Sequence, residues 1–248
     1  MILNIACTEM TMSLYRRLAI GALSALLLAS LALGQQDYIG QFDVYSAYTY
    51  LRSPLLNLGE SGFHTQVGTN PAKWYSMGFD FSATAGDTVL VPTMLKSSVQ
   101  QAIASQLAAY GLSNVPIAVP LHSRTQSYAM GPQLNYRRLR FATLFIHPDL
   151  GAMHETALPH PNTTTPSQQV ITTMLISQMA PTGTKEDWVA FYGVGGGVDL
   201  NVTRHVGVKI HVDLVHDHLF SDLLPGRNTV RFSVGPSFHF GKNMAATK

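Results

Sequence analysis

Histidines and carboxylates recur close together in this chain, and these residue types bind metals or transfer protons. Of the ten histidines, several stand beside acids. Two groups combine the two types: His216-Asp217-His218, and a looser group of His147, Asp149, His154 and Glu155. If the fold brings them together, such side chains could ligate a divalent cation or act as general acid and base in hydrolysis.

The segments that carry these groups weaken a joint chemical role. Side chains on an extended chain alternate between two faces, so His216 and His218 share the outward face and Asp217 points inward. We therefore interpret these residues as solvated polar groups near a strand end. The sequence predicts no catalytic residue, no cofactor and no metal ligand, and a hydrolytic site at the rim is the less favoured alternative.

A second kind of candidate comes from polar residues that alternate with apolar ones. From Val206 to Val212, four β-branched residues fall on one face of an extended chain, whereas Lys209 and His211 fall on the other. A turn at 203–205 would place Asp199 about opposite Lys209, which predicts an ion pair between them.

Other polar residues are expected on the same inward face. If the last hairpin keeps a simple register, Arg231 would meet Asp217. We interpret His64 and His239, like His211, as hydrogen-bonding partners inside the fold. The glycines at 193–197 lie within an alternating segment, which favours close packing or internal space over a phosphate-binding loop. The structural candidates are Asp199, Lys209, His211, Arg231 and Asp217.

Composition sets limits on what the chain can be. Its 248 residues are 46% hydrophobic and only 12% charged, whereas about 25% charged residues is usual in soluble domains. The net charge is +2 with no basic cluster, so the sequence predicts no nucleic-acid partner. The length allows one large β domain or two small ones.

The N-terminus has the pattern of a secretory signal peptide. Arg16 and Arg17 precede an apolar run at 18–33, and small residues close it at Gly34. We expect a signal peptide at 1–34, with Met12 as an alternative start, and export through the inner membrane. Cys7, the only cysteine, would leave with it, so the mature chain would have no disulfide. A barrel domain at 35–241 and a short tail at 242–248 would follow.

Eight segments of the mature chain alternate between apolar and polar residues, at 42–51, 63–70, 76–82, 128–136, 139–145, 188–202, 206–212 and 230–240. Connections are predicted to be long after the first, third, fifth and seventh, and tight after the others. This is typical of an outer-membrane barrel with short periplasmic turns and longer extracellular loops. A soluble sandwich would not sort its loops by parity.

Two long irregular stretches, 86–126 and 151–187, interrupt the strands. The spacing of apolar residues at 94–110 predicts a helix that ends before Gly111. At 170–177 the pattern allows either a short helix or an extra strand. Pro148 predicts a bulge or a strand end.

The side chains on the apolar faces decide which way the strands point. Those faces carry twelve aromatic residues, too much bulk for a narrow interior: Phe42, Tyr48, Tyr50, Phe79, Phe81, Phe141, Phe145, Trp188, Tyr192, Phe232, Phe238 and Phe240. The opposite faces carry glycine and polar residues that suit a tight lumen. Lipid outside and a polar interior fit both faces, with Trp74, Tyr136, Trp188 and Phe240 in interfacial girdles.

The chain resembles the small outer-membrane β-barrel proteins, the OmpA-like transmembrane domains, in their stand-alone version. The stretches that carry the resemblance are FDVYSAYTYLR (42–52), GPQLNY (131–136), GVGGGVDLNVTRHVGVK (193–209) and VRFSVGPSFHFG (230–241). It implies an all-β, eight-stranded antiparallel up-and-down transmembrane barrel in the bacterial outer membrane. It also implies assembly by the barrel-insertion machinery, with Phe240 as the insertion signal, although eight residues follow it.

Four functions are then open. The first is a structural barrel in outer-membrane lipid whose long loops bind a surface ligand, without enzymatic activity. The second is a narrow, porin-like pore, which side chains in an eight-stranded lumen would tend to block. The third is the rim hydrolase described above, and the fourth is a soluble, lipocalin-like barrel.

Overall fold

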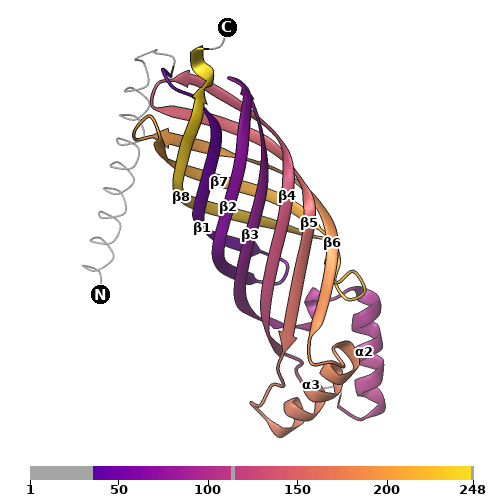
Figure 1. The fold of residues 1–248 in the computed structure, drawn as a ribbon. Coiled ribbons are helices and arrows are strands. Elements are labelled where there is room, and N and C mark those ends of the chain that lie inside the picture. The colour runs from indigo at the N-terminus through magenta and orange to yellow at the C-terminus, as the bar shows by residue number, and fades with distance from the viewer. Residues whose placement is uncertain (1–35, 113–114, 247–248) are drawn as a thin grey trace, which may run out of the picture.

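The computed structural model describes residues 36–112 and 115–246. The expected signal peptide at 1–34, with Met12 and Cys7, lies outside the described residues. Within the described part, eight strands close into one barrel in which each strand pairs with its neighbours in sequence and β1 pairs with β8. All pairs are antiparallel. The predicted up-and-down barrel is confirmed (Figure 1).

The strands are 12 to 21 residues long. Their bounds are β1 (Gly40–Ser53), β2 (Leu58–Ala72), β3 (Tyr75–Leu90), β4 (Val119–Leu139), β5 (Ala142–Pro159), β6 (Lys185–Asn201), β7 (Val206–Asp217) and β8 (Arg227–Asn243). Most extend past the segments predicted from alternation. Alternation is strong only where one face is apolar, and many of the added residues, such as 122–126 in β4, carry polar side chains on both faces.

The two ends of the barrel differ. We call one of them the turn end. It holds the start of β1, the end of β8 and the short connections 73–74, 140–141 and 202–205. The other, the loop end, holds the connections 54–57, 91–118, 160–184 and 218–226. The expectation of a long connection after the first strand was wrong, because β1 and β2 continue to a four-residue hairpin turn.

Helices lie in the two long connections, at the loop end of the barrel (Figure 1). The first connection holds a 3-10 turn η1 (Pro92–Met94) and α2 (Ser97–Ala109), close to the helix predicted there. The second holds α3 (Pro166–Met179), which resolves the helix-or-strand ambiguity at 170–177. A last 3-10 turn, η2 (Met244–Ala246), follows β8. None of the helices in the described residues is long and apolar enough to cross a membrane.

The outside of the barrel is apolar along most of its length. Large apolar side chains from all eight strands are exposed there, among them Tyr48, Phe63, Phe79, Met130, Ile146, Tyr192, Val212 and Phe232. In β7 the side chains of Val206, Val208 and Val212 are exposed, while Lys209 and His211 are buried. The orientation predicted for this strand is confirmed.

Aromatic rings form a row around the outside toward the loop end. Phe63, Phe81, Tyr128 and Trp188 come from β2, β3, β4 and β6 in turn. Their successive ring centroids are 5.6, 5.1 and 6.0 Å apart. Toward the turn end, Trp74, Tyr136 and Phe240 are exposed on the same outer surface.

The fifth strand faces the opposite way from its prediction. Phe145 and Thr143 are buried, whereas Leu144 and Ile146 are exposed. The turn lies at 140–141 rather than at 137–138, and the β4–β5 register shifts between Tyr136 and Leu139. A shift of one residue inverts every side chain of a strand, so Phe145 enters the lumen.

Pro148 neither ends β5 nor bulges it. β5 continues to Pro159, and its pairing with β6 keeps one register from Ala142 to Ala157. Its pairing with β4 has the same register on both sides of the proline, although 147–150 have no partners there. The expected bulge or strand end was wrong, and only the pairing with β4 lapses at Pro148.

A compact apolar core closes the loop end. It joins side chains from the hairpin turn, from both helices, from the 218–226 connection and from the strand ends. Its buried members include Leu56, Leu58, Leu95, Ile103, Leu107, Ile171, Leu175, Leu219, Phe220 and Leu224. We call this core, together with α2 and α3, the cap.

Candidate functional site

The lumen of the barrel is filled with polar and charged side chains. They come from the strand positions opposite the apolar outer face, as strand alternation requires. Most of them are buried and hydrogen-bonded to one another, and they form a column of contacts between the turn end and the cap. This column and the cap are the two parts of the molecule that could bind or react.

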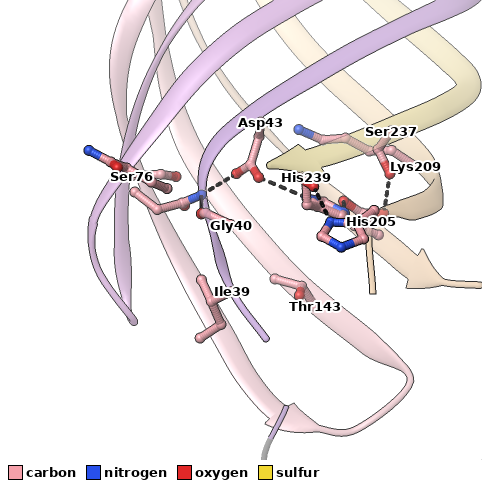
Figure 2. A network of polar contacts seen from close by, with 12 residues as sticks. Ile39, Gly40, Asp43, Ser76, Thr143, His205, Lys209, Ser237 and His239 are labelled. Atoms are coloured by element: carbon pink, nitrogen blue, oxygen red, sulfur yellow. Dashed lines mark hydrogen bonds and ion pairs between the residues drawn. The ribbon is translucent and has the colours of Figure 1, made fainter. Parts of the chain in front are cut away.

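At the turn end, one imidazole lies between two carboxylates. His239 Nδ1 is 2.7 Å from Asp43 Oδ1, and its Nε2 is 3.3 Å from Asp199 Oδ2. Figure 2 shows Asp43 of β1 and His239 of β8 pointing toward each other. Ser237 donates to Asp199 at 2.6 Å. This network lines a cavity of about 330 Å³.

The predicted pair of Asp199 and Lys209 is half correct. The two are cross-strand partners, and both side chains are buried. The ion pair itself is not formed. Asp199 contacts His239 and Ser237, whereas the Lys209 ammonium donates to the side-chain amide oxygen of Gln66, Oε1. Its nitrogen also lies 4.3 Å from the centre of the Phe145 ring, a cation–π contact. The inversion of β5 brought that ring into the lumen.

In the middle of the lumen, a guanidinium is held by strands on several sides. Arg231 Nε donates to Asp213 Oδ2 at 2.7 Å, and its Nη1 donates to Ser127 and Ser82 at 2.9 and 3.1 Å. The expected meeting of Arg231 with Asp217 was wrong, because the register of β7 and β8 places Asp213 opposite Arg231. The hairpin differs by four residues from the simple register.

Histidines surround this guanidinium. His64 is buried and contacts Asp80 Oδ1 at 2.8 Å and Ser233 at 3.1 Å. His211 is buried as well, and its Nε2 lies 2.7 Å from both Asp213 Oδ1 and His147 Nε2.

Nearer the cap, a second guanidinium joins two carboxylates. Arg227 Nε donates to Asp217 Oδ1 at 2.8 Å, and its Nη2 contacts Glu155 Oε2. Asp217 also accepts from the backbone N–H of Leu219 at 3.1 Å, and Leu219 belongs to the cap. Asp217 thus connects the polar lumen to the apolar cap.

The residues considered for a rim site do not converge. His147, Asp149 and Glu155 are buried in the lumen, whereas His154 stacks on Trp188 with ring centroids 4.5 Å apart. His216 and His218 contact each other edge to face at 4.9 Å. Asp217 turns inward to Arg227, as alternation predicted.

Sequence reasoning missed Asp213, Arg227 and His147 as lumen residues. Asp213 and Arg227 occupy inward positions of their strands, so alternation extended beyond 206–212 and 230–240 would have found them. His147 points into the lumen because β5 faces the opposite way from its prediction, and no local sequence pattern indicates that inversion. Phe240, the expected insertion signal, is exposed beside Phe42, with ring centroids 5.9 Å apart, and β8 continues to Asn243.

The two helices of the cap present an uncharged surface. Neither α2 nor α3 has a charged residue, and Lys96 and His160 are the only basic side chains in the connections 91–118 and 160–184. The exposed helix positions are mostly glutamine, serine, threonine and alanine.

No family model matches this chain, and no curated protein matches it in sequence. Its structural neighbours include small outer-membrane barrels. A structure of Ail, the attachment invasion locus protein of Yersinia pestis, in complex with the heparin analogue sucrose octasulfate, has a TM-score of 0.45 at 11% identity, over 83% of this chain and 100% of that one. Neisserial surface protein A has a TM-score of 0.48 at 8% identity, over 80% and 96%. OprG of Pseudomonas aeruginosa has a TM-score of 0.44 at 8% identity, over 84% and 99%.

Proposed function

We propose that this protein is an outer-membrane β-barrel whose loop end faces the outside and whose cap binds a surface ligand. The observation that carries the proposal is the reversal of polarity across the barrel wall. Apolar and aromatic side chains are exposed on all eight strands, while the buried lumen holds the charged ones. A soluble barrel requires the opposite arrangement, and lipid around the wall would cover the exposed apolar surface.

The filled lumen argues against the porin-like alternative. At mid-height Arg231 donates to Asp213 and Ser82, and buried His64 contacts Asp80. The cap closes the loop end. Ion flow would require both layers to open. We expect no channel events from the purified protein in a planar lipid bilayer, and steady unitary currents would favour the pore instead.

The scattered rim residues argue against the hydrolase alternative. A hydrolytic site needs its acid, base and nucleophile within hydrogen-bond reach of one substrate position. Here His216 and His218 face outward while Asp217 is engaged by Arg227. This supports a binding or structural role for the barrel.

The cap determines which ligand chemistry fits. Ail has been solved with a sulfated sugar, but a polyanion would find only Lys96 and His160 on the two long connections of this chain. Helices rich in glutamine, serine and threonine recognise partners through hydrogen bonds and apolar contact. The ligand is therefore expected to be uncharged, with binding that changes little between low and high salt.

Location is tested by fractionation and gel mobility. We expect the mature chain in outer-membrane fractions and a faster mobility before boiling than after it, because the closed barrel resists unfolding in detergent. A chain that is freely soluble after export would contradict the proposal.

Orientation is tested by epitope insertion on intact cells. Tags after Thr164 and Gly183, both exposed in the loop-end connection 160–184, should be labelled. A tag after Arg204 in the turn 202–205 is the matched control and should be labelled only after lysis. The reverse pattern would overturn the topology.

A further inference from the structure

The centre of the lumen holds three ligand atoms that converge on one point. They are His147 Nε2, His211 Nε2 and Asp213 Oδ1. His211 Nε2 is 2.7 Å from each of the other two, which are 3.6 Å apart. All three residues are buried, and all lie apart from the cap that we assign to ligand binding.

Hydrogen bonding does not give each of these atoms a partner of its own. A neutral ring nitrogen either donates its proton or accepts through its lone pair. Because His147 Nδ1 faces Asp149, its Nε2 is an acceptor, and the single proton on His211 Nε2 would have to be shared between that lone pair and Asp213 Oδ1. If His211 Nε2 carried no proton, two lone pairs and a carboxylate oxygen would face one another. Asp213 Oδ1 and His211 Nδ1 are also buried without a hydrogen-bond partner.

A metal ion would give all three atoms a partner. A triangle with sides of 2.7, 2.7 and 3.6 Å has a circumscribed radius of about 1.8 Å, which is below the roughly 2.0–2.1 Å of zinc–imidazole bonds. An ion slightly out of the plane of the three atoms can therefore reach each of them at a normal bond length. Two imidazoles and a carboxylate suit zinc and other first-row divalent metals.

Neighbouring groups orient two of the three ligands, His147 and Asp213, as in metal sites. His147 Nδ1 is 3.2 Å from Asp149 Oδ1, so a carboxylate fixes the ring and leaves Nε2 free to ligate. The second oxygen of Asp213 is held by Arg231 at 2.7 Å. Three carboxylates, of Asp80, Asp149 and Asp213, lie around the site against two cations, Arg231 and Lys209, so the surroundings favour an added cation.

A glycine in the strand between the ligands lets their side chains approach each other. Gly195 of β6 is the cross-strand partner of both His147 in β5 and Asp213 in β7. A Cβ at this position would lie 2.0 Å from Asp213 Oδ1 and 2.6 Å from His147 Nε2. Only a residue without a side chain leaves room between the two ligands.

The site is also adjacent to an entry path. The 330 Å³ cavity at the turn end extends inward to Tyr45, Phe145 and Lys209. The rings of Phe145 and His211 are 5.3 Å apart. An ion entering from the turn end would therefore be separated from the site by one layer of side chains.

We propose that His147, His211 and Asp213 bind one divalent transition-metal ion, with Zn²⁺ as the probe, and that this ion links β5 to β7 across Gly195. This departs from the expectation, drawn from sequence, that no residue ligates a metal.

The test is metal content in the purified, folded full chain. After removal of metal with a chelator, reloading with Zn²⁺ and removal of free ion, we expect about one Zn²⁺ per chain by mass spectrometry. His147→Gln and His211→Gln should reduce the content at least tenfold. His64→Gln is the matched control, because His64 is an equally buried lumen histidine outside the triangle, and it should keep the wild-type content. His216→Gln, which removes an exposed histidine pair, should also keep it.

Wild-type protein that retains no Zn²⁺, or His147→Gln and His211→Gln variants that retain the wild-type amount, would overturn the proposal. Mobility before and after boiling shows whether each variant is folded. If the variants do not fold, Co²⁺ in the wild-type chain decides: visible ligand-field bands that one equivalent of Zn²⁺ removes support the site, and their absence overturns it.

Discussion

The lumen and the cap are both buried, but they are built from opposite kinds of side chain. The lumen contains guanidinium, carboxylate and imidazole groups that contact one another across the barrel. The cap is a cluster of leucine, isoleucine and phenylalanine that resembles the core of a soluble protein. The boundary between them lies at Asp217, which binds Arg227 on one side and the backbone of Leu219 on the other.

The difference follows from what surrounds each region. If lipid surrounds the barrel wall, as proposed, it takes most apolar side chains outward, and the strands have mostly polar side chains left for the inside, with Phe145 among the exceptions. The cap extends beyond the wall, where water drives apolar residues inward. One chain therefore has polar side chains inside the barrel and apolar side chains inside the cap. The change from one kind of interior to the other takes place within a few residues of β7.

The two regions should consequently fail in different ways. Lumen contacts depend on specific partners, and a charge that loses its partner is left buried. Cap contacts depend on apolar area and packing, and the two long connections that carry them can open while the strand pairing of the barrel persists.

The largest effect is expected from Arg227→Gln. It leaves the carboxylates of Asp217 and Glu155 buried without their cation, and removing one partner of a buried ion pair costs about 3–5 kcal/mol. The free energy of unfolding, measured by urea titration in lipid vesicles, should fall by that amount.

Lys185→Gln is the control for this prediction. It breaks an ion pair with Asp222 of 2.7 Å at the same end of the barrel, but there the carboxylate is mostly exposed. A loss of at most about 1 kcal/mol is expected. Equal losses in the two variants would mean that burial does not distinguish the lumen pairs.

A smaller and local effect is expected from Ile171→Ala in α3. Ile171 is 1% exposed within the cap, and truncation of a buried isoleucine costs about 2–5 kcal/mol. The cost should appear as faster proteolysis within 160–184, while mobility before boiling still shows a closed barrel. Val170→Ala is the adjacent control, because Val170 is 65% exposed, and its cleavage rate should stay near that of the wild type. Loss of the fast-migrating form in Ile171→Ala would show that cap and barrel unfold together.

The same physical contrast explains which parts of the fold could be predicted from sequence. Alternation records which face is apolar and lies on the outside of the barrel, so the number of strands and the outward faces of seven strands follow from it. It does not record register. Arg231 was therefore paired with the wrong aspartate, and β5 was inverted by a shift near Leu139 that has no signature in residue type.

The cap and the proposed metal site were harder to predict for a related reason. Apolar spacing indicated a helix in the first long connection and left a helix or an extra strand open in the second. Which side chains those helices bury depends on contacts distant in sequence, such as Leu56 with the helices. The ligands His147 and Asp213 meet only because Gly195 lies between them in the sheet, and sequence spacing does not show this.

The smallest effect is expected at the start of α3. There the independence of the cap from the lumen can be tested by removing a single hydrogen bond. The hydroxyl of Thr165, the N-cap residue, accepts from the backbone N–H of Gln168 at 3.2 Å. Thr165→Ala leaves that donor without its partner and should cost about 1 kcal/mol, seen as faster amide exchange in the first turn of α3. Thr164→Ala is the control, because Thr164 lies one residue outside the cap position. If the cap is an independently opening unit, exchange in β4 and β5 should be unchanged, because the lost bond stabilises only the helix. Faster exchange in those strands would instead mean that the polar lumen depends on the cap above it.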